Sequence, residues 1–163
     1  MEKYFDKGEL DEDEIKAGMK KAMIHHDLFP LFCLSAERNM GSGRLMGFID
    51  NVCPSANEMP PQKTKAGSTL PCDENGPGCI FIYKTVSEPH VGELSFFKVY
   101  SGTIKSGMEL VNETTGVAEK MNQLFVVEGN KRTQVNELTA GDIGATLKLR
   151  NTHVNNTLHE KGK

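Results

Sequence analysis

The feature that most constrains the fold is the stretch GELSFFKVYSGTIKSG, residues 92–107. From Glu93 to Ile104 it is rich in β-branched and aromatic residues, which are typical of strands. Gly102 interrupts this pattern near its end, and glycine inside a strand usually marks a bend or a bulge. Lys105-Ser106-Gly107 then predicts a turn. A strand of this length needs partners, so we expect a β-sheet domain around it.

Shorter β-prone segments surround this strand. Cys79–Val86 precedes it, with Ile80, Ile82 and Lys84 alternating against Phe81, Tyr83 and Thr85. The segments after it are separated mostly by glycines, and they are Met108–Asn112, Glu119–Val127 and Ile143–Lys148. About five to seven short strands with such turn signals predict a small closed barrel or a sandwich.

The region before residue 54 has a different pattern. Asp11 followed by Glu14 resembles a capping box, so residues 10–27 predict a helix. Its apolar stripe consists of Ile15, Met19, Ala22 and Met23. The continuous apolar run Leu28–Leu34 predicts a buried strand of a parallel sheet, although Pro30 favours the start of that strand or an edge position. A second helix is predicted around Leu45–Val52, ending at Pro54.

Charge and proline content divide the chain. Residues 1–60 hold seven Lys and Arg against eleven Asp and Glu, whereas residues 61–163 hold twelve against eleven. Residues 54–78 carry five of the seven prolines, which is typical of a linker or a long loop. We therefore predict a first unit over residues 1–60, a linker over 61–78 and a β domain over 79–163.

The sequence contains no motif for self-contained catalysis. It lacks a GxxxxGK[ST] phosphate loop, a GxGxxG fingerprint and an HExxH pair. Gly41–Gly43 precedes a helix without a suitably placed Lys, so a loop-to-helix turn is favoured over a phosphate site. His25 and His26 point in different directions on a helix, and His90 is interpreted as a turn residue.

The four cysteines give no complete metal site. Cys72 and Cys79 are separated by six residues, where structural zinc sites have about two to four, and no second Cys or His pair completes the ligands. A disulfide or half a metal site is the alternative to incidental loop thiols, which we favour. We expect no metal in this chain.

Nothing in the sequence predicts membrane insertion. No run of about 18 apolar residues exists, and the acidic start MEKYFDKGELDEDE lacks the apolar region of a signal peptide. We therefore expect a cytoplasmic protein with no membrane partner.

Two long blocks resemble the second domain of elongation factor G, the ribosomal translocase. They are VSEPHVGELSFFKVYSGTIKSGMELVN and GNKRTQVNELTAGDIGATLKLRNT. The resemblance extends over residues 1–160, because the segments before residue 54 look like the late helix, final strand and final helix of that family's GTP-binding domain. It implies a mainly β fold: a translation-factor β-barrel preceded by a helix-strand-helix remnant of an α/β GTPase domain.

The resemblance also implies function. The parent protein would bind GTP with Mg²⁺ and hydrolyse it on the ribosome to drive tRNA–mRNA movement. The phosphate loop, the switch regions and the NKxD motif would lie before Met1, so the chain itself is expected to be no enzyme and to hold no cofactor. Ser35 and Ala36 match the "SA" element whose backbone contacts guanine, although by residue type alone they are ordinary loop residues.

By the same resemblance the barrel docks on small-subunit rRNA and packs against its own GTPase domain. The candidate phosphate contacts follow from charge alone and are Lys98, Lys105, Lys120, Lys131 and Arg132. The alternative for each is a solvated surface side chain.

The sequence is also compatible with other functions. The parent could instead be a ribosomal protection protein or a release-factor-recycling GTPase, or the barrel could be a free-standing RNA- or protein-interaction module. Without the rest of an α/β sheet, Leu28–Leu34 and the faces of Ile15, Met19, Leu45 and Phe48 would expose apolar surface. We expect them to collapse onto each other or onto a second copy of the chain.

Overall fold

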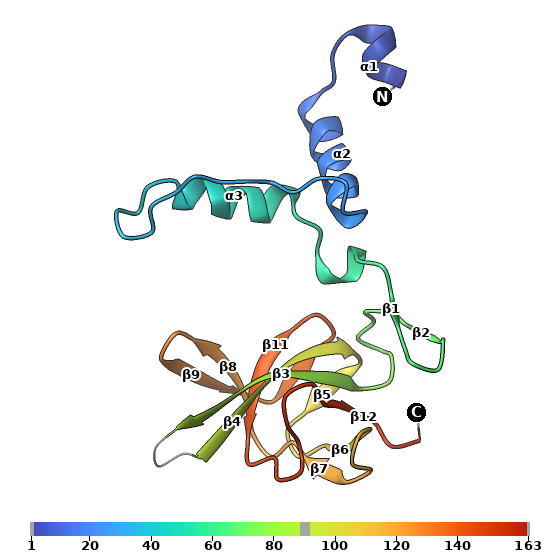
Figure 1. Ribbon diagram of the computed structural model, residues 1–163, viewed down its shortest axis with the longest axis vertical. Helices are drawn as coiled ribbons and strands as arrows, with labels where there is room; N and C mark the ends of the chain where they lie inside the picture. The colour runs from blue at the N-terminus through green and yellow to red at the C-terminus, as the bar shows by residue number, and fades with distance from the viewer. Residues whose placement is uncertain (1, 89–91, 163) are drawn as a thin grey trace. The chain divides into compact units, whose positions relative to one another are not determined.

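The computed structural model describes residues 2–88 and 92–162, so His90 lies outside the described residues. The chain divides into two compact units, Met1–Met59 and Pro60–Lys163 (Figure 1). The first unit is helical and the second is built of strands. None of the described helices is long and apolar enough to cross a membrane.

The first unit contains α1 (Glu2–Lys7), α2 (Glu12–Ile24), α3 (Ser42–Val52) and the short 3-10 helix η1 (Ala56–Glu58). The predicted capping box is confirmed at α2. The Glu14 amide donates to Asp11 Oδ1 at 2.8 Å, and the Asp11 amide donates to Glu14 Oε2 at 3.2 Å. Both hydrogen bonds satisfy amides that the first turn of a helix leaves without partners.

The prediction of a buried strand over residues 28–34 is wrong. The segment forms no strand, and the side chains of Phe29 and Leu31 are 78% and 92% exposed. A strand requires a hydrogen-bonding neighbour, and the described part of the first unit offers only the isolated bridge between Ser35 and Met40. One side of the segment still packs on α3, where the rings of Phe32 and Phe48 lie 4.9 Å apart, edge to face.

In its described residues, 60–88 and 92–162, the second unit contains a small hairpin and ten further strands. Figure 1 shows how they are arranged. The hairpin, β1 (Gln62–Lys63) with β2 (Thr69–Leu70), lies within the segment that the sequence predicted as a linker. The other strands are β3 (Cys79–Glu88), β4 (Gly92–Ser101), β5 (Thr103–Lys105), β6 (Glu109–Asn112), β7 (Ala118–Lys120), β8 (Leu124–Glu128), β9 (Lys131–Val135), β10 (Glu137–Thr139), β11 (Ile143–Leu147) and β12 (Thr157–His159).

Eight of these strands form an antiparallel sheet in the order β7-β6-β12-β3-β4-β11-β8-β9, and β10 pairs with β5. The bend predicted at Gly102 is confirmed, because β4 ends at Ser101 and β5 begins at Thr103. Beyond the bend, β5 continues β4, and β10 continues β9 from the end of the sheet. The pairing of β5 with β10 therefore joins the edge of the sheet at β9 to the central strand β4. This closure makes the domain the predicted small barrel.

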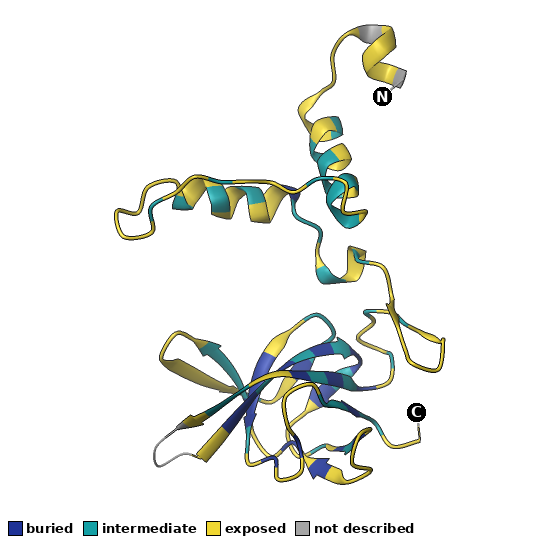
Figure 2. Ribbon diagram, in the orientation of Figure 1, coloured by how far each residue is buried: buried dark blue, intermediate teal, exposed yellow. Residues whose placement is uncertain are grey.

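The core of the barrel is a cluster of buried apolar residues contributed by most of its strands, and Figure 2 shows buried positions along these strands in dark blue. The largest of them is Phe97 on β4, which is fully buried. The others in this cluster are Ile80, Ile82, Val99, Ile104, Leu110, Met121, Leu124, Leu138, Leu149 and Leu158. Alternation along β4 buries Phe97 and Val99 and turns Phe96, Lys98 and Tyr100 outward.

Two buried polar side chains tie the loops to the barrel. Asn112 Nδ2 donates to Asn151 O at 3.0 Å and Asn156 Oδ1 at 2.9 Å, while Asn112 Oδ1 accepts from the Thr114 amide at 2.9 Å. Glu119 Oε1 accepts from the Asn151 amide at 2.6 Å. These bonds satisfy polar groups that burial would otherwise leave without partners.

The single strand predicted over Glu119–Val127 is two strands. The structure divides it into β7 and β8, and Met121 between them is fully buried in the core. Strands β9, β10 and β12 were not predicted. Along β9 the first four residues are exposed on both faces, so the strand carries no apolar alternation that a sequence pattern detects.

Candidate nucleic-acid interface

The turn before α3 contains the two residues that the resemblance assigned to guanine. The Ser35 amide donates to Met40 O at 3.0 Å, the Met40 amide donates to Ser35 O at 2.9 Å, and the Asn39 amide donates to Ala36 O at 3.1 Å. In the described part of the chain the Ala36 amide has no acceptor, so it remains able to donate to a ligand. Gly41 then opens α3 with a φ of +82°, as a loop-to-helix turn requires.

Three of the predicted phosphate contacts lie opposite acidic residues. The cross-strand partner of Lys105 on β5 is Glu137, that of Lys120 on β7 is Glu109, and that of Lys131 on β9 is Glu128. Opposite charges at facing positions of a sheet attract each other. All three lysines are exposed, but a neighbouring carboxylate weakens the positive potential that each presents to a phosphate.

The other two candidates have apolar neighbours. Lys98 on β4 is opposite Ile143 on β11 and Phe81 on β3, and its ammonium group lies 5.3 Å from the centre of the Tyr100 ring. Arg132 on β9 is opposite Val127 on β8. Because side chains alternate along a strand, Arg132 and its neighbour Lys131 point to opposite faces of β9. The structure therefore does not gather the five cations into one patch.

The structure does gather a group that the sequence reasoning missed. Outward-facing rings and lysines of β3 and β4 form what we call the aromatic–lysine strip, consisting of Phe81, Tyr83, Lys84, Phe96, Lys98 and Tyr100. The Phe81 and Tyr100 rings have centroids 6.4 Å apart, as do those of Tyr83 and Phe96. The Lys84 ammonium lies 5.6 Å from the centre of the Phe96 ring. The alternation of aromatic residues along Cys79–Val86 was the available signal.

A profile of the elongation factor G domain 2 family matches residues 77–161. The chain belongs to this family. The match contains all five predicted cations and the whole aromatic–lysine strip. Ser35 and Ala36 lie before it.

A comparison of folds extends the likeness to nearly the whole chain. A crystal structure of a protein from Thermus thermophilus aligns with a TM-score of 0.75 and 24% sequence identity. The alignment covers 99% of this chain and 22% of that protein, so this elongation factor G domain 2 chain spans about a fifth of that protein's length. The likeness shows that the two share a fold.

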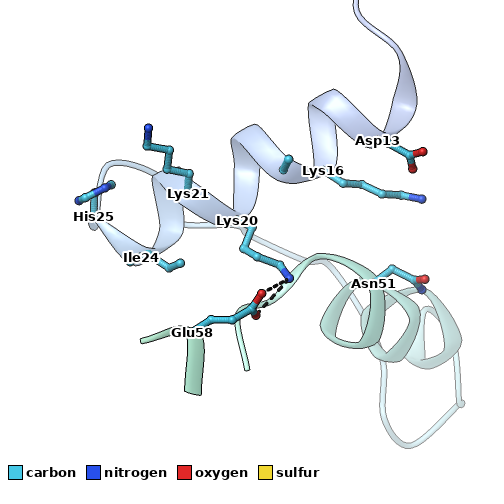
Figure 3. Close-up of a pocket in the computed structure, with 9 residues that line it drawn as sticks. Asp13, Lys16, Lys20, Lys21, Ile24, His25, Asn51 and Glu58 are labelled. Carbon is cyan, nitrogen blue, oxygen red and sulfur yellow. Dashed lines mark hydrogen bonds and ion pairs between the residues drawn. The ribbon is translucent and has the colours of Figure 1, made fainter. Parts of the chain in front are cut away.

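Outside the elongation factor G domain 2 match, the first unit has an open cleft of about 500 Å³ between α2, α3 and η1 (Figure 3). The Lys20 ammonium bridges it to Glu58 at 3.0 Å and 3.1 Å. A hydrogen bond from the Ser55 amide, and to a smaller extent one from Lys20, lowers the pKa of Glu58 to about 2. His25 lines this cleft, whereas the ring of His26 stacks on Phe29 with centroids 6.5 Å apart. The ion pair of Lys20 with Glu58 links α2 to η1 across this cleft.

The titratable groups that the structure describes form no metal centre. Among the described residues no three His, Cys, Asp or Glu side chains are grouped as a metal ion requires. Cys72 and Cys79 are both free thiols. Burial raises the pKa of the Cys79 thiol to about 11, which makes it a poor nucleophile near neutral pH.

Proposed function

We propose that this chain is part of a cytosolic translational GTPase of the elongation factor G type, in which the barrel docks the protein on small-subunit ribosomal RNA. The observation that carries the proposal is the elongation factor G domain 2 match over residues 77–161. The whole protein would couple GTP hydrolysis, with Mg²⁺, to the movement of tRNA and mRNA, and its GTPase domain would pack against the barrel.

Exposed cations on the barrel support docking on RNA. A Lys or Arg that neutralises a phosphate releases a counterion, so each contact steepens the dependence of affinity on salt by about 0.7 to 0.9 in logarithmic slope. Lys105, Lys120 and Lys131 are exposed and project from three different strands. Dispersed contacts of this kind fix the orientation of a domain on RNA without reading sequence.

Binding of the chain to isolated small ribosomal subunits at several salt concentrations tests the docking. We expect association that weakens with salt, and Lys131→Gln should reduce the slope by about 1. Lys21→Gln on α2 removes the same charge outside the barrel and should leave the slope unchanged. Absence of association at low salt, or association that is insensitive to salt, would contradict the proposal.

We further propose that this chain by itself neither binds nor hydrolyses GTP. The Ala36 amide offers one hydrogen-bond donor to the edge of a guanine base, and a single amide provides little affinity. The sequence contains no GxxxxGK[ST] or NKxD motif, so this chain offers no built site for the phosphates or for Mg²⁺. Titration with a fluorescent GTP analogue should show no saturable binding, and saturable binding would overturn this part of the proposal.

A further inference from the structure

The aromatic–lysine strip is built into the strand pairing of the barrel. Because Phe97 and Val99 face the core, their neighbours Phe96, Lys98 and Tyr100 face outward. Phe96 and Tyr100 are four residues apart on one strand, which is about 13 Å. The two ring pairs, one at each of these positions, therefore form two separate aromatic contacts along β4, with ring planes 71° apart at Tyr100 and 50° apart at Phe96.

A bulge completes the strip. The pairing of β3 with β4 shifts register between Ile82 and Lys84, with Ile82 opposite Phe97 and Lys84 opposite Phe96. Simple alternation would place Lys84 on the inner face with Ile82. The shift instead leaves Ile82 fully buried, while Lys84 and Tyr83 are both exposed and Lys84 lies over an outward ring.

Three cross-strand partners of the strip on β11 and β12 are uncharged. Thr157 on β12 lies opposite Phe81, and on β11 Ile143 lies opposite Lys98 and Ala145 opposite Phe96. The strip thus combines four rings with two ammonium groups, and none of these cross-strand partners is acidic. The side chain of Ile143 is 57% exposed and extends the apolar part of the surface.

This combination matches unpaired nucleotides. A base that is not stacked in a duplex packs its flat face on an aromatic ring, and its phosphate attracts a nearby ammonium group. In the free protein each lysine lies over the face of a ring. When a base stacks on that ring, the ammonium group moves aside and stays close to the phosphate of the same nucleotide. A duplex offers the rings no unstacked base, because its bases are stacked on one another inside the helix.

We propose that the aromatic–lysine strip binds a single-stranded segment of RNA, with bases stacked on the rings and phosphates paired with Lys84 and Lys98. The inference does not depend on ribosomal docking, since Lys105, Lys120 and Lys131 lie outside the strip and only Lys98 belongs both to the strip and to the five predicted rRNA contacts. A free oligonucleotide tests it without ribosomes, so the two proposals succeed or fail separately.

The experiment measures the fluorescence anisotropy of a labelled ten-nucleotide single-stranded RNA titrated with the full 163-residue chain. We expect saturable binding that is stronger than binding to a duplex of the same sequence. Tyr83→Ala should weaken single-strand binding about tenfold, because a base stacked on a ring is worth about that factor or more. Tyr83→Phe keeps the ring and should retain the affinity. Lys98→Gln should reduce the salt slope by about 1.

The matched control is Tyr4→Ala, which removes a tyrosine of the first unit that is 50% exposed, against 41% for Tyr83. It should leave RNA affinity unchanged. Circular dichroism of each variant checks that the barrel remains folded. Equal affinity for duplex and single strand, equal loss with Tyr4→Ala and Tyr83→Ala, or no binding at all would overturn the proposal.

Discussion

Replacing Gly102 by alanine tests the bend that closes the barrel. Gly102 has a φ of +76°, and a Cβ added there would lie 2.6 Å from both the Cα and the amide nitrogen of Gly78. Those atoms cannot move away easily, because Gly78 N donates to Glu160 Oε2 at 3.3 Å and Gly78 O accepts from the Glu160 amide at 2.8 Å. The Gly102 amide is itself held, since it donates to Asp73 O at 2.8 Å.

The expected loss has two parts. A left-handed backbone conformation costs a residue with a Cβ about 1–2 kcal/mol, and forcing an extra carbon into a closely packed site costs about 1–3 kcal/mol more. Gly102→Ala should therefore lower the free energy of unfolding by about 2–5 kcal/mol. Gly107→Ala is the matched control, because Gly107 has a φ of +86° with no atom within 4 Å of the added Cβ. Its free energy of unfolding should fall only by the backbone cost of about 1–2 kcal/mol.

Urea unfolding measures the difference, followed by the near-ultraviolet circular dichroism of the barrel tyrosines. With a slope of about 1–2 kcal/mol per molar urea, the midpoint of Gly102→Ala should fall by about 2 M and that of Gly107→Ala by about 1 M. Equal midpoints for the two variants would refute the reasoning, because they would show that the close approach of Gly78 contributes nothing.

Three further predictions concern single side chains. Asn112→Ala should lower the free energy of unfolding of the barrel by about 2–4 kcal/mol in urea, since it leaves buried partners of Asn112 unsatisfied; a loss below about 1 kcal/mol would contradict this. Asp11→Ala should destabilise α2 by about 1 kcal/mol, seen as reduced helical circular dichroism, and unchanged helicity would argue against the cap. Burial raises the folded pKa of Cys79 above its unfolded value, to about 11. The buried, protonated thiol therefore contributes fully to the free energy of unfolding below about pH 9, and this contribution is lost as the pH rises towards 11. At pH 8 a disulfide reagent should therefore modify exposed Cys33 well before Cys79, and equal rates would contradict the burial.

Local chemistry made part of the fold predictable. The capping box at Asp11 and Glu14 needs only neighbouring residues, so sequence and structure agree there. The bend at Gly102 is equally predictable from the sequence, because a single glycine interrupts an otherwise continuous β pattern. The division of Glu119–Val127 into two strands could not be predicted, because buried Met121 continues the apolar pattern through the gap between β7 and β8.

The binding surfaces were less predictable than the fold. Charge alone selected Lys105, Lys120 and Lys131, and only strand register shows that each has a glutamate opposite. Alternation along Cys79–Val86 placed Lys84 with the core residues, and the bulge reverses this. A register shift depends on the partner strand, which a local pattern does not contain.

The sequence by itself determined the run of strand formers from Glu93, its interruption at Gly102 and the elongation factor G domain 2 family. These depend on residue type and order, which act within a few positions along the chain. The tertiary structure decided that Leu28–Leu34 forms no strand and that aromatic rings and lysines of β3 and β4 share one outer face. Both depend on which segments lie next to each other, because hydrogen-bonding partners and register are set between strands and not within them.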